Sequence, residues 1–371
     1  MDPILFRRHI HSHPELSFCE EATAAFIEQA LCEQGIESRR VAKTGVLAKI
    51  EGRGALNRAI VLRADIDALP VEEATGVEYS SVNKGVMHAC GHDMHAAMLY
   101  GALCKLNEDC NFKGTIFGLF QPGEECNPGG ASLVLVEDPF AGYEVFAVVG
   151  QHVDAMLEVG TAGFCSGKFM ASGDELRFEV CGVGGHAAMR NKLKDPVAAT
   201  AQLITSLLAL NHSECVLSIG RIEADGATNV IPHTVKLEGT LRTFDQGVRD
   251  NTKAQIRRLA AECAAQYDLE IVVDINDGYP CVVNDARLTA EAMEVAAGKW
   301  HVENLGRRTT AEDFGYYCTL YPSLFYRVGV GLDAGAPHTP IFCPSEGAIT
   351  VGIELMESLA LRFIDYEKEE K

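Results

Sequence analysis

Short apolar runs recur along the first half of the chain and once more near its end, and each has the length of a buried strand. Apolar residues at helical spacing precede the first of these runs, at 21–33, and lie between two later ones, at 93–106. Strands that are apolar on both faces are typical of a parallel sheet, and their alternation with helices indicates an α/β domain. The predicted strands cover residues 46–51, 59–65, 114–120, 145–150 and 324–329.

The middle of the chain has a different pattern, in which apolar and polar residues alternate. Asp195 is a favourable N-cap for a helix that begins at Pro196. The predicted elements are a strand at 174–182, a helix at 196–210, strands at 215–222 and 234–243, a helix at 248–266 and a strand at 270–275. This order is the split βαβ arrangement of a ferredoxin-like domain.

The two patterns predict a ferredoxin-like α+β domain, 172–279, inserted into a discontinuous α/β domain, 1–171 and 280–371. A chain of 371 residues is long enough for about two domains. Because the chain crosses between the domains twice at one hinge, we expect the inserted domain to act as a lid.

Composition excludes several partners. The formal net charge of −20 argues against nucleic acid and anionic membranes, which attract basic surfaces. No apolar run is long enough for a signal peptide or a membrane span. The 13 cysteines are odd in number and follow no repeated spacing, so reduced thiols in the cytoplasm are expected rather than a disulfide framework.

The first candidate metal ligands lie at 87–95, where the sequence reads MHACGHDMH at the start of a predicted helix. Thiols and imidazoles are the ligands that zinc and related metals select, and a glycine lets the backbone turn tightly between them. Taken alone, a histidine-rich turn could equally cap the helix.

The ends of the predicted strands decide between these alternatives. Ligands of open α/β sheets bind outside the carboxyl ends of the strands, so side chains that follow different strands should meet there. The residues in question are Glu124 and Glu125, His152, His338, and the pair Asp65 and Asp67. Together with the Cys90–His95 turn, they predict a metal site.

The adjacent glutamates indicate hydrolysis. One carboxylate can bind a metal while its neighbour takes a proton from a water whose pKa the metal lowers toward ~7. Outside this context, Glu124 and Glu125 would be an ordinary acidic loop.

A set of motifs spread over nearly the whole chain resembles the aminoacylase and carboxypeptidase-like metallopeptidases, peptidase family twenty. Within that family the match is to amidohydrolase subgroup D, which contains hippurate hydrolases, auxin-conjugate hydrolases and N-acetyldiaminopimelate deacetylases. The motifs are HSHPELSF at 11–18, RADIDALPV at 63–71, MHACGHDMH at 87–95, QPGEE at 121–125, GGHAA at 184–188, NVIP at 229–232, GTLRT at 239–243, AEDF at 311–314 and HTP at 338–340.

The resemblance implies a zinc-peptidase-like catalytic domain with two divalent metal ions per subunit. The implied metal ligands are Cys90, His92, Glu125, His152 and His338. Glu124 would then be the general base, with Asp65 or Asp67 in a supporting role. Zinc suits this ligand set best, followed by manganese, with cobalt and nickel also known in the family.

The inserted domain would complete the site. By resemblance, His186 polarises the scissile carbonyl across a homodimer interface, and Asn229 and Arg242 hold substrate, since an arginine fork suits a free carboxylate. Without the resemblance, His186 would be a strand-edge histidine and Arg242 a surface arginine. Two departures from the subgroup, Met189–Arg190–Asn191 after GGHAA and Gly123 in place of alanine, touch loops around the cleft and leave the ligands and the base in place.

The predicted activity is cleavage of the amide bond of N-acetyl or other N-acyl amino acids. A dipeptidase using the same site is the nearest enzymatic alternative, but the sequence shows no group to receive its substrate's ammonium. A non-catalytic metal-binding protein on the same scaffold is the other alternative. Glu124 argues against it, because metal binding alone needs no spare base.

Overall fold

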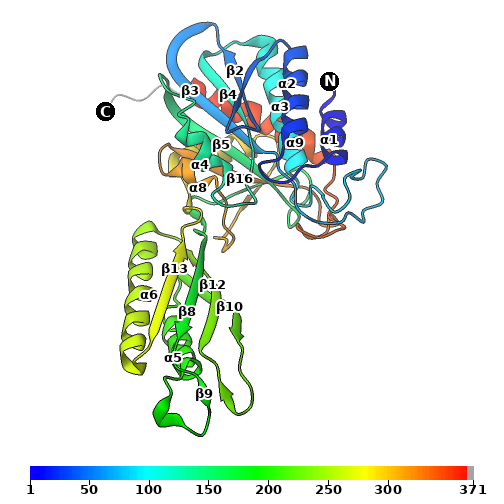
Figure 1. The fold of residues 1–371 in the computed structure, drawn as a ribbon. Helices are drawn as coiled ribbons and strands as arrows, with labels where there is room; N and C mark the ends of the chain where they lie inside the picture. Colours follow the sequence, from blue (N-terminus) through cyan, green and yellow to red (C-terminus); the bar gives the residue numbers. More distant parts are fainter. Residues whose placement is uncertain (366–371) are drawn as a thin grey trace, which may run out of the picture. The chain divides into compact units, whose positions relative to one another are not determined.

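The computed structural model describes residues 1–365, so the last six residues of the predicted 280–371 segment lie outside the described part (Figure 1). The chain divides into two compact units. Within the described residues, unit 1 contains residues 1–167, 283–306 and 313–365, and unit 2 contains residues 168–282 and 307–312. The short segment 307–312 joins unit 2 because Arg308 hydrogen bonds through its backbone with Phe169 and Ala171.

Unit 1 is built on an eight-stranded mixed sheet with the order β1-β2-β4-β3-β5-β16-β6-β15. Its four central strands, β4, β3, β5 and β16, are parallel to one another. The strands are β1 (Glu37–Val41), β2 (Gly45–Glu51), β3 (Gly54–Asp65), β4 (Lys113–Gln121), β5 (Glu144–Asp154), β6 (Thr161–Phe164), β15 (His301–Asn304) and β16 (Ser323–Gly329). The predicted α/β class is confirmed.

Helices cover both faces of this sheet (Figure 1). One face carries α1 (Pro3–Ser12), α2 (Glu21–Glu33), α3 (His92–Asp109), α7 (Ala286–Ala297) and α9 (Gly347–Ile364), and the other carries α4 (Gly130–Val136) and α8 (Gly315–Cys318). Within the described residues, no helix is both long and apolar enough to cross a membrane.

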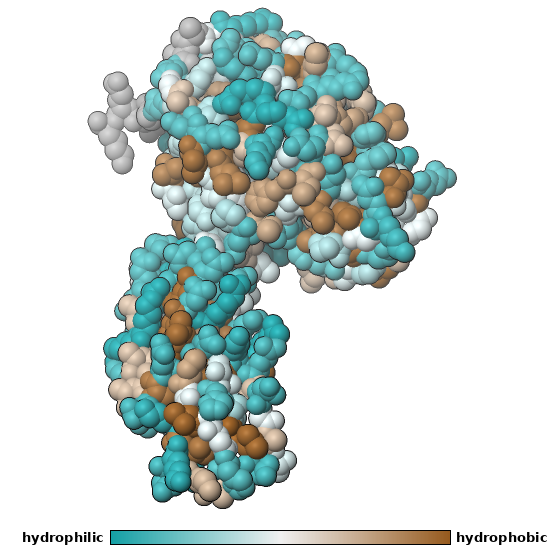
Figure 2. Space-filling model, viewed as in Figure 1, coloured by the Kyte–Doolittle hydropathy of each residue, from teal (hydrophilic) through white to brown (hydrophobic). Residues whose placement is uncertain are grey.

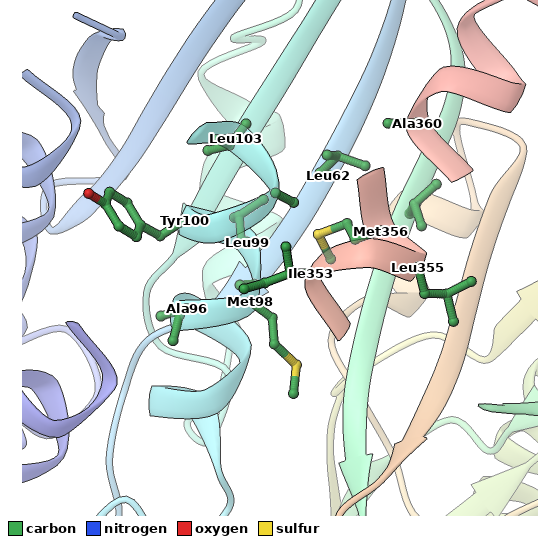
Figure 3. Packing of buried hydrophobic residues seen from close by; sticks show 14 of the residues in the cluster. Leu62, Ala96, Met98, Leu99, Tyr100, Leu103, Ile353, Leu355, Met356 and Ala360 are labelled. Atoms are coloured by element: carbon green, nitrogen blue, oxygen red, sulfur yellow. The ribbon is translucent and has the colours of Figure 1, made fainter. Parts of the chain in front are cut away.

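The centre of unit 1 is the close contact between α3 and α9. A Cβ on Gly352 would lie 2.2 Å from the sulfur of Met98, and one on Gly101 would lie 2.4 Å from Ile353. Glycine at these two positions therefore lets the helices approach closely. Figure 3 shows the apolar side chains that fill the contact, Met98, Leu99 and Leu103 from α3, Ile353 and Met356 from α9, and Leu62 from β3.

Unit 2 is a four-stranded antiparallel sheet with two helices. The sheet order is β10-β12-β8-β13, and the chain order is strand, helix, strand, strand, helix, strand. This is a split βαβ arrangement. Its elements are β8 (Asp174–Cys181), α5 (Pro196–Leu208), β10 (Cys215–Ala224), β12 (Thr234–Thr243), α6 (Gln246–Tyr267) and β13 (Glu270–Asn276).

Alternation along β8 explains how unit 2 folds. Leu176, Phe178 and Val180 are buried, and they pack with Leu203 and Leu207 of α5. The residues between them point to the other face of the sheet. The view in Figure 2 shows hydrophilic residues over most of the surface of each unit.

The remaining elements are short. They are β7 (Gly167–Met170) with its partner β14 (Val282–Asn284), β9 (Gly185–His186) with its partner β11 (Val230–Ile231), and the 3₁₀ turn Arg190–Lys192.

Candidate metal centre

The carboxyl ends of the central parallel strands define one edge of the unit 1 sheet. Asp65 ends β3 and pairs with Gln121, the last residue of β4. His152 lies within β5, because that strand continues to Asp154, beyond the predicted end at 150. The helix α3 begins at the same edge, and Gly91 precedes it with a left-handed φ of 86° that favours glycine.

Five predicted ligand side chains meet at this edge. The Cys90 sulfur lies 3.5 Å from His152 Nε2 and 3.4 Å from His338 Nε2. Glu125 Oε1 lies 3.4 Å from His338 Nε2 and 3.9 Å from His92 Nε2. Two groups of donors therefore overlap at Cys90, one with His92 and His152 and the other with Glu125 and His338.

Two buried atoms in this cluster test whether a metal fits. His92 Nε2 and Glu125 Oε1 have no hydrogen-bond partner among the described residues. Buried polar atoms without a partner are unfavourable, and divalent cations bound in the cluster would satisfy them. Sulfur, nitrogen and carboxylate donors at this spacing suit a divalent transition metal. The residues present therefore fit the metal site that the sequence predicts.

Hydrogen bonds on the far side of two imidazoles fix their orientation. His92 Nδ1 lies 2.9 Å from the Asp67 carbonyl oxygen, and His152 Nδ1 lies 2.7 Å from the Val153 carbonyl oxygen. Since a carbonyl oxygen only accepts, each Nδ1 donates a proton. In the neutral imidazole this leaves the lone pair on Nε2, the nitrogen that faces the cluster, as a metal ligand requires.

Asp67 supports the cluster from behind. Its carboxylate lies 3.2 Å from His92 Nδ1 and accepts hydrogen bonds from the Glu125 amide at 3.0 Å and the Ser17 hydroxyl at 2.7 Å. Burial alone would raise the pKa of Asp67, but these hydrogen bonds, led by that of His92, lower it. The carboxylate stays charged and joins two proposed ligands.

Asp65 supports the cluster through His95, for which the sequence analysis predicted no role. His95 Nδ1 lies 2.5 Å from Asp65, and its Nε2 accepts the Val153 amide at 2.9 Å. Both nitrogens are therefore engaged, so His95 positions the backbone beside His152 rather than binding metal. Its spacing of three residues from His92 places both on one face of α3, a signal available from the sequence.

Burial and nearby carboxylates set the charge of the cluster. Burial raises the pKa of the Cys90 thiol to about 12, and Glu125 acts in the same direction. Burial lowers the pKa of His152 well below its usual value, so that imidazole is neutral. Burial alone would lower the pKa of His92, but the Asp65 carboxylate raises this pKa well above its usual value. The Cys90 thiol and the His92 imidazole would release these protons if they bound a divalent cation.

His338 lies at the exposed rim of the cluster, and Glu124 lies beside the cluster. His338 has 55% of its side chain exposed and a left-handed φ of 63°, and its amide donates to the Ala89 carbonyl at 2.7 Å. Glu124 is buried, with 7% of its surface exposed, and one of its oxygens lies within 4.8 Å of donor atoms of His92 and Glu125. The adjacent glutamates thus face the same cluster.

The predicted residues of unit 2 lie at two ends of its sheet. His186 on β9 pairs with Val230, and the Ala187 amide donates to the Asn229 carbonyl at 2.9 Å, so His186 and Asn229 are neighbours. Arg242 lies on β12, eight residues beyond Thr234, which is about 26 Å at the usual rise per strand residue. The structure therefore does not bring Arg242 together with His186 within one unit 2.

Arg242 is half-buried and has no ion pair within residues 1–365. Its guanidinium donates to the Leu241 carbonyl oxygen at 3.3 Å. Burial lowers the pKa of Arg242, with the carboxylates of Asp174 and Glu175 acting in the opposite direction. A partly desolvated guanidinium without a bound carboxylate is suited to an external one.

A parallel-rich α/β sheet with a thiol, imidazoles and paired carboxylates at its carboxyl edge defines a metallohydrolase. The chain belongs to peptidase family M20/M25/M40, whose family model matches residues 61–362. The predicted family is confirmed.

Proteins that are similar over nearly the whole chain indicate which kind of hydrolase it is. The chain is 40% identical to the N-acetyl-L-cysteine deacetylase of Bacillus subtilis (strain 168), across 98% of this chain and 89% of the relative. It is 35% identical to the N-acetyldiaminopimelate deacetylase of Oceanobacillus iheyensis, across 96% of this chain and 98% of the relative. A solved dinuclear metal-binding peptidase of the M20 family from Bacillus subtilis is 36% identical, with a TM-score of 0.87 over 98% of both chains. The chain is accordingly a hydrolase that acts on amide bonds.

Proposed function

We propose that this protein removes the acyl group from N-acyl amino acids, using two divalent metal ions held by Cys90, His92, Glu125, His152 and His338. The observation that carries the proposal is the pair of buried, unpartnered atoms His92 Nε2 and Glu125 Oε1 beside Glu124. The names of the relatives support acetyl as the acyl group.

Glu124 is the general base. Cys90, His92, Glu125, His152 and His338 would hold metal ions that, when bound, would lower the pKa of water and polarise the amide carbonyl. Glu124 accepts a proton from the attacking water and passes it to the nitrogen of the leaving amino acid. Glu125 contacts His92 and His338, and Glu124 lies beside it, so the two neighbouring carboxylates can divide binding and proton transfer between them.

Arg242 binds the carboxylate of the substrate, Asn229 helps to hold the substrate, and His186 polarises the scissile carbonyl. Along β12, Arg242 is about 26 Å from the end that carries His186. An N-acetyl amino acid spans about two residues, or ~7 Å of extended chain. One substrate cannot contact both residues of one subunit, which supports a homodimer in which unit 2 also mediates dimerisation and His186 acts in the partner's site.

Zinc is the proposed metal, with manganese next and cobalt or nickel as further candidates, since a thiolate among imidazoles favours a softer metal. The proposed location is the cytoplasm. All 13 cysteines lie within the described residues and are free thiols, as a reducing compartment requires.

A release assay on metal-stripped protein tests the proposal. The substrates are acetyl, benzoyl, succinyl and indoleacetyl amino acids beside free dipeptides, and zinc, manganese or cobalt is added back separately. Metal-restored release from acyl amino acids is the expected result. Cleavage of dipeptides alone would instead establish a dipeptidase, and tight metal binding without turnover would establish the non-catalytic alternative.

A further inference from the structure

The loop that carries Glu124 is held by a carboxylate from a distant part of the chain. The Gly123 amide donates to Glu20 Oε1 at 2.9 Å, and the Thr44 hydroxyl donates to Glu20 Oε2 at 2.6 Å. Glu20 and Thr44 are 0% and 1% exposed. One buried side chain therefore connects the residue before Glu124 with the turn that precedes β2.

The backbone on either side of Glu124 is fixed at two further points. The Gly130 amide donates to the Gly123 carbonyl at 2.9 Å, and the Glu125 amide donates to Asp67 at 3.0 Å. Glu124 thus lies between two residues whose peptide groups are already hydrogen-bonded. The Glu20 bond is the one that holds the amide of Gly123.

Packing against this loop leaves little room for it to move. A Cβ on Gly123 would lie 2.3 Å from the Phe18 ring, and Gly123 has a left-handed φ of 61°. Phe18 is two residues before Glu20, so one short segment supplies both the ring and the carboxylate.

Stability alone does not explain a carboxylate at position 20. Glu20 has no ion pair within the described residues, and burial raises its pKa, against the hydrogen bond from Thr44. A buried charge without a cation is unfavourable, and apolar side chains of similar volume commonly stabilise such positions better. The side chain is instead suited to orient one particular peptide group.

We propose that Glu20 is a positioning residue for the general base, acting through the Gly123 amide to set where the Glu124 carboxylate points. This inference rests on the proposed function, in which Glu124 takes a proton from water. A base acts when its oxygen lies about 2.6–3.2 Å from the atom that carries the proton, and a displacement of ~1 Å can lower a rate ~100-fold.

The test compares Glu20→Ala and Glu20→Gln with Glu15→Ala as the matched control. Glu15 lies on the same segment and also accepts from backbone amides and a threonine hydroxyl, those of Ala22 and Thr23. We expect Glu20→Ala to lower kcat ~100-fold with KM within ~3-fold, since the base is misplaced while binding groups remain. Glutamine keeps an oxygen for the Gly123 amide, so Glu20→Gln should recover most of the lost kcat.

Metal content, melting temperature and amide hydrogen exchange separate this role from a structural one. Glu20→Ala should bind metal as the wild type does and should show faster exchange at Gly123, with Glu15→Ala unchanged there. A wild-type kcat in metal-loaded Glu20→Ala, or a loss explained entirely by lost metal or folding, would overturn the inference while the wild-type activity stands. A wild type inactive on every acyl amino acid would overturn the proposed function, whatever the exchange data show.

Discussion

His92 Nε2 and Glu125 Oε1 lie 3.9 Å apart, both buried and both without a hydrogen-bond partner in the described part of the chain. The distance is too long for a hydrogen bond, and both atoms are available to bind metal. The opposite side of each residue is satisfied, His92 by the Asp67 carbonyl and Glu125 by the Asp67 carboxylate on its amide. Asp67 therefore orients both residues toward the same point.

Removal of the shared thiol should abolish metal binding. We expect Cys90→Ala and His338→Ala to bind metal more than ~100-fold more weakly, because even outer-shell partners of a metal site contribute about 10–100-fold. Metal content by elemental analysis after dialysis provides the measurement. Cys104→Ala, which removes a thiol from α3 outside the cluster, should keep the wild-type content, and equal loss in that variant would contradict a specific role for Cys90.

Arg242→Ala should lower kcat/KM for substrates that carry a free carboxylate. A charge-assisted hydrogen bond contributes about 1.5–3 kcal/mol, so we expect kcat/KM to fall roughly 10–150-fold. The fall should disappear for substrates with an amidated C-terminus, whose carboxylate is already missing. Arg221→Ala on β10 is the control, since Arg221 is already paired with Glu223. An equal effect on both substrate types would remove the proposed role of Arg242.

Gly123→Ala should destabilise the loop through a clash with Phe18. Overpacking costs ~1–3 kcal/mol, in addition to the strain of a left-handed alanine, ~1 kcal/mol. Gly76→Ala is the matched control, because Gly76 has a similar φ of 74° and nothing within 4 Å of its added Cβ. In a double-mutant cycle monitored by urea unfolding, Phe18→Ala should relieve the excess cost of Gly123→Ala over Gly76→Ala. Additive effects would exclude the clash.

Asp174→Asn should destabilise unit 2. Asp174 is buried and accepts from Arg249 at 2.6 and 2.9 Å and pairs with Lys253 at 2.9 Å. Burial acts to raise the pKa of Asp174, but the hydrogen bonds from Arg249 and Lys253 lower it below its usual value. The stabilisation is therefore complete above the ordinary carboxyl pKa of ~3.9 and is lost as pH falls through the lower pKa of the folded state.

At pH 7 the loss in Asp174→Asn should be about 3–5 kcal/mol, the usual cost of breaking a buried ion pair, and it should shrink below pH ~3.9. Urea unfolding across that range measures it. Glu262→Gln, which breaks the exposed Arg258–Glu262 pair on α6, should change stability by no more than ~0.5 kcal/mol. A difference from wild type that is independent of pH would contradict the assigned charge.

Local patterns predicted much of the fold. The helix at 21–33 and the strand at 234–243 have the predicted bounds, because hydrophobic periodicity and turn residues define them locally. Strand β1 was not predicted, since its sequence ESRRV is polar and its pairing with β2 is decided by tertiary contacts. Helix α9 was not predicted either, because it is apolar on most sides and its buried surface hides the helical period.

The candidate site was predicted as far as strand ends allow. Strand ends and the turn before α3 predicted a metal site at this edge, the family resemblance implied its five ligands, and the structure brings those residues together. Glu20 could not be assigned in the same way, because its role depends on a contact with Gly123, 103 residues away, and no local pattern encodes such a contact. The spacing of His95 from His92 places it on the same face of α3, but its contact with Val153, 58 residues away, is not encoded locally.

The adjacent glutamates offer the most direct test of the whole account. Glu124→Gln and Glu125→Gln each replace a carboxylate with an amide of the same shape and remove one charge. The two variants differ in position by one residue. Metal content and turnover of an N-acetyl amino acid are measured on both. We predict that Glu124→Gln keeps its metal and loses about 100- to 10,000-fold in kcat, the usual contribution of a general base, whereas Glu125→Gln loses metal. Near-normal turnover in Glu124→Gln would contradict the proposed mechanism.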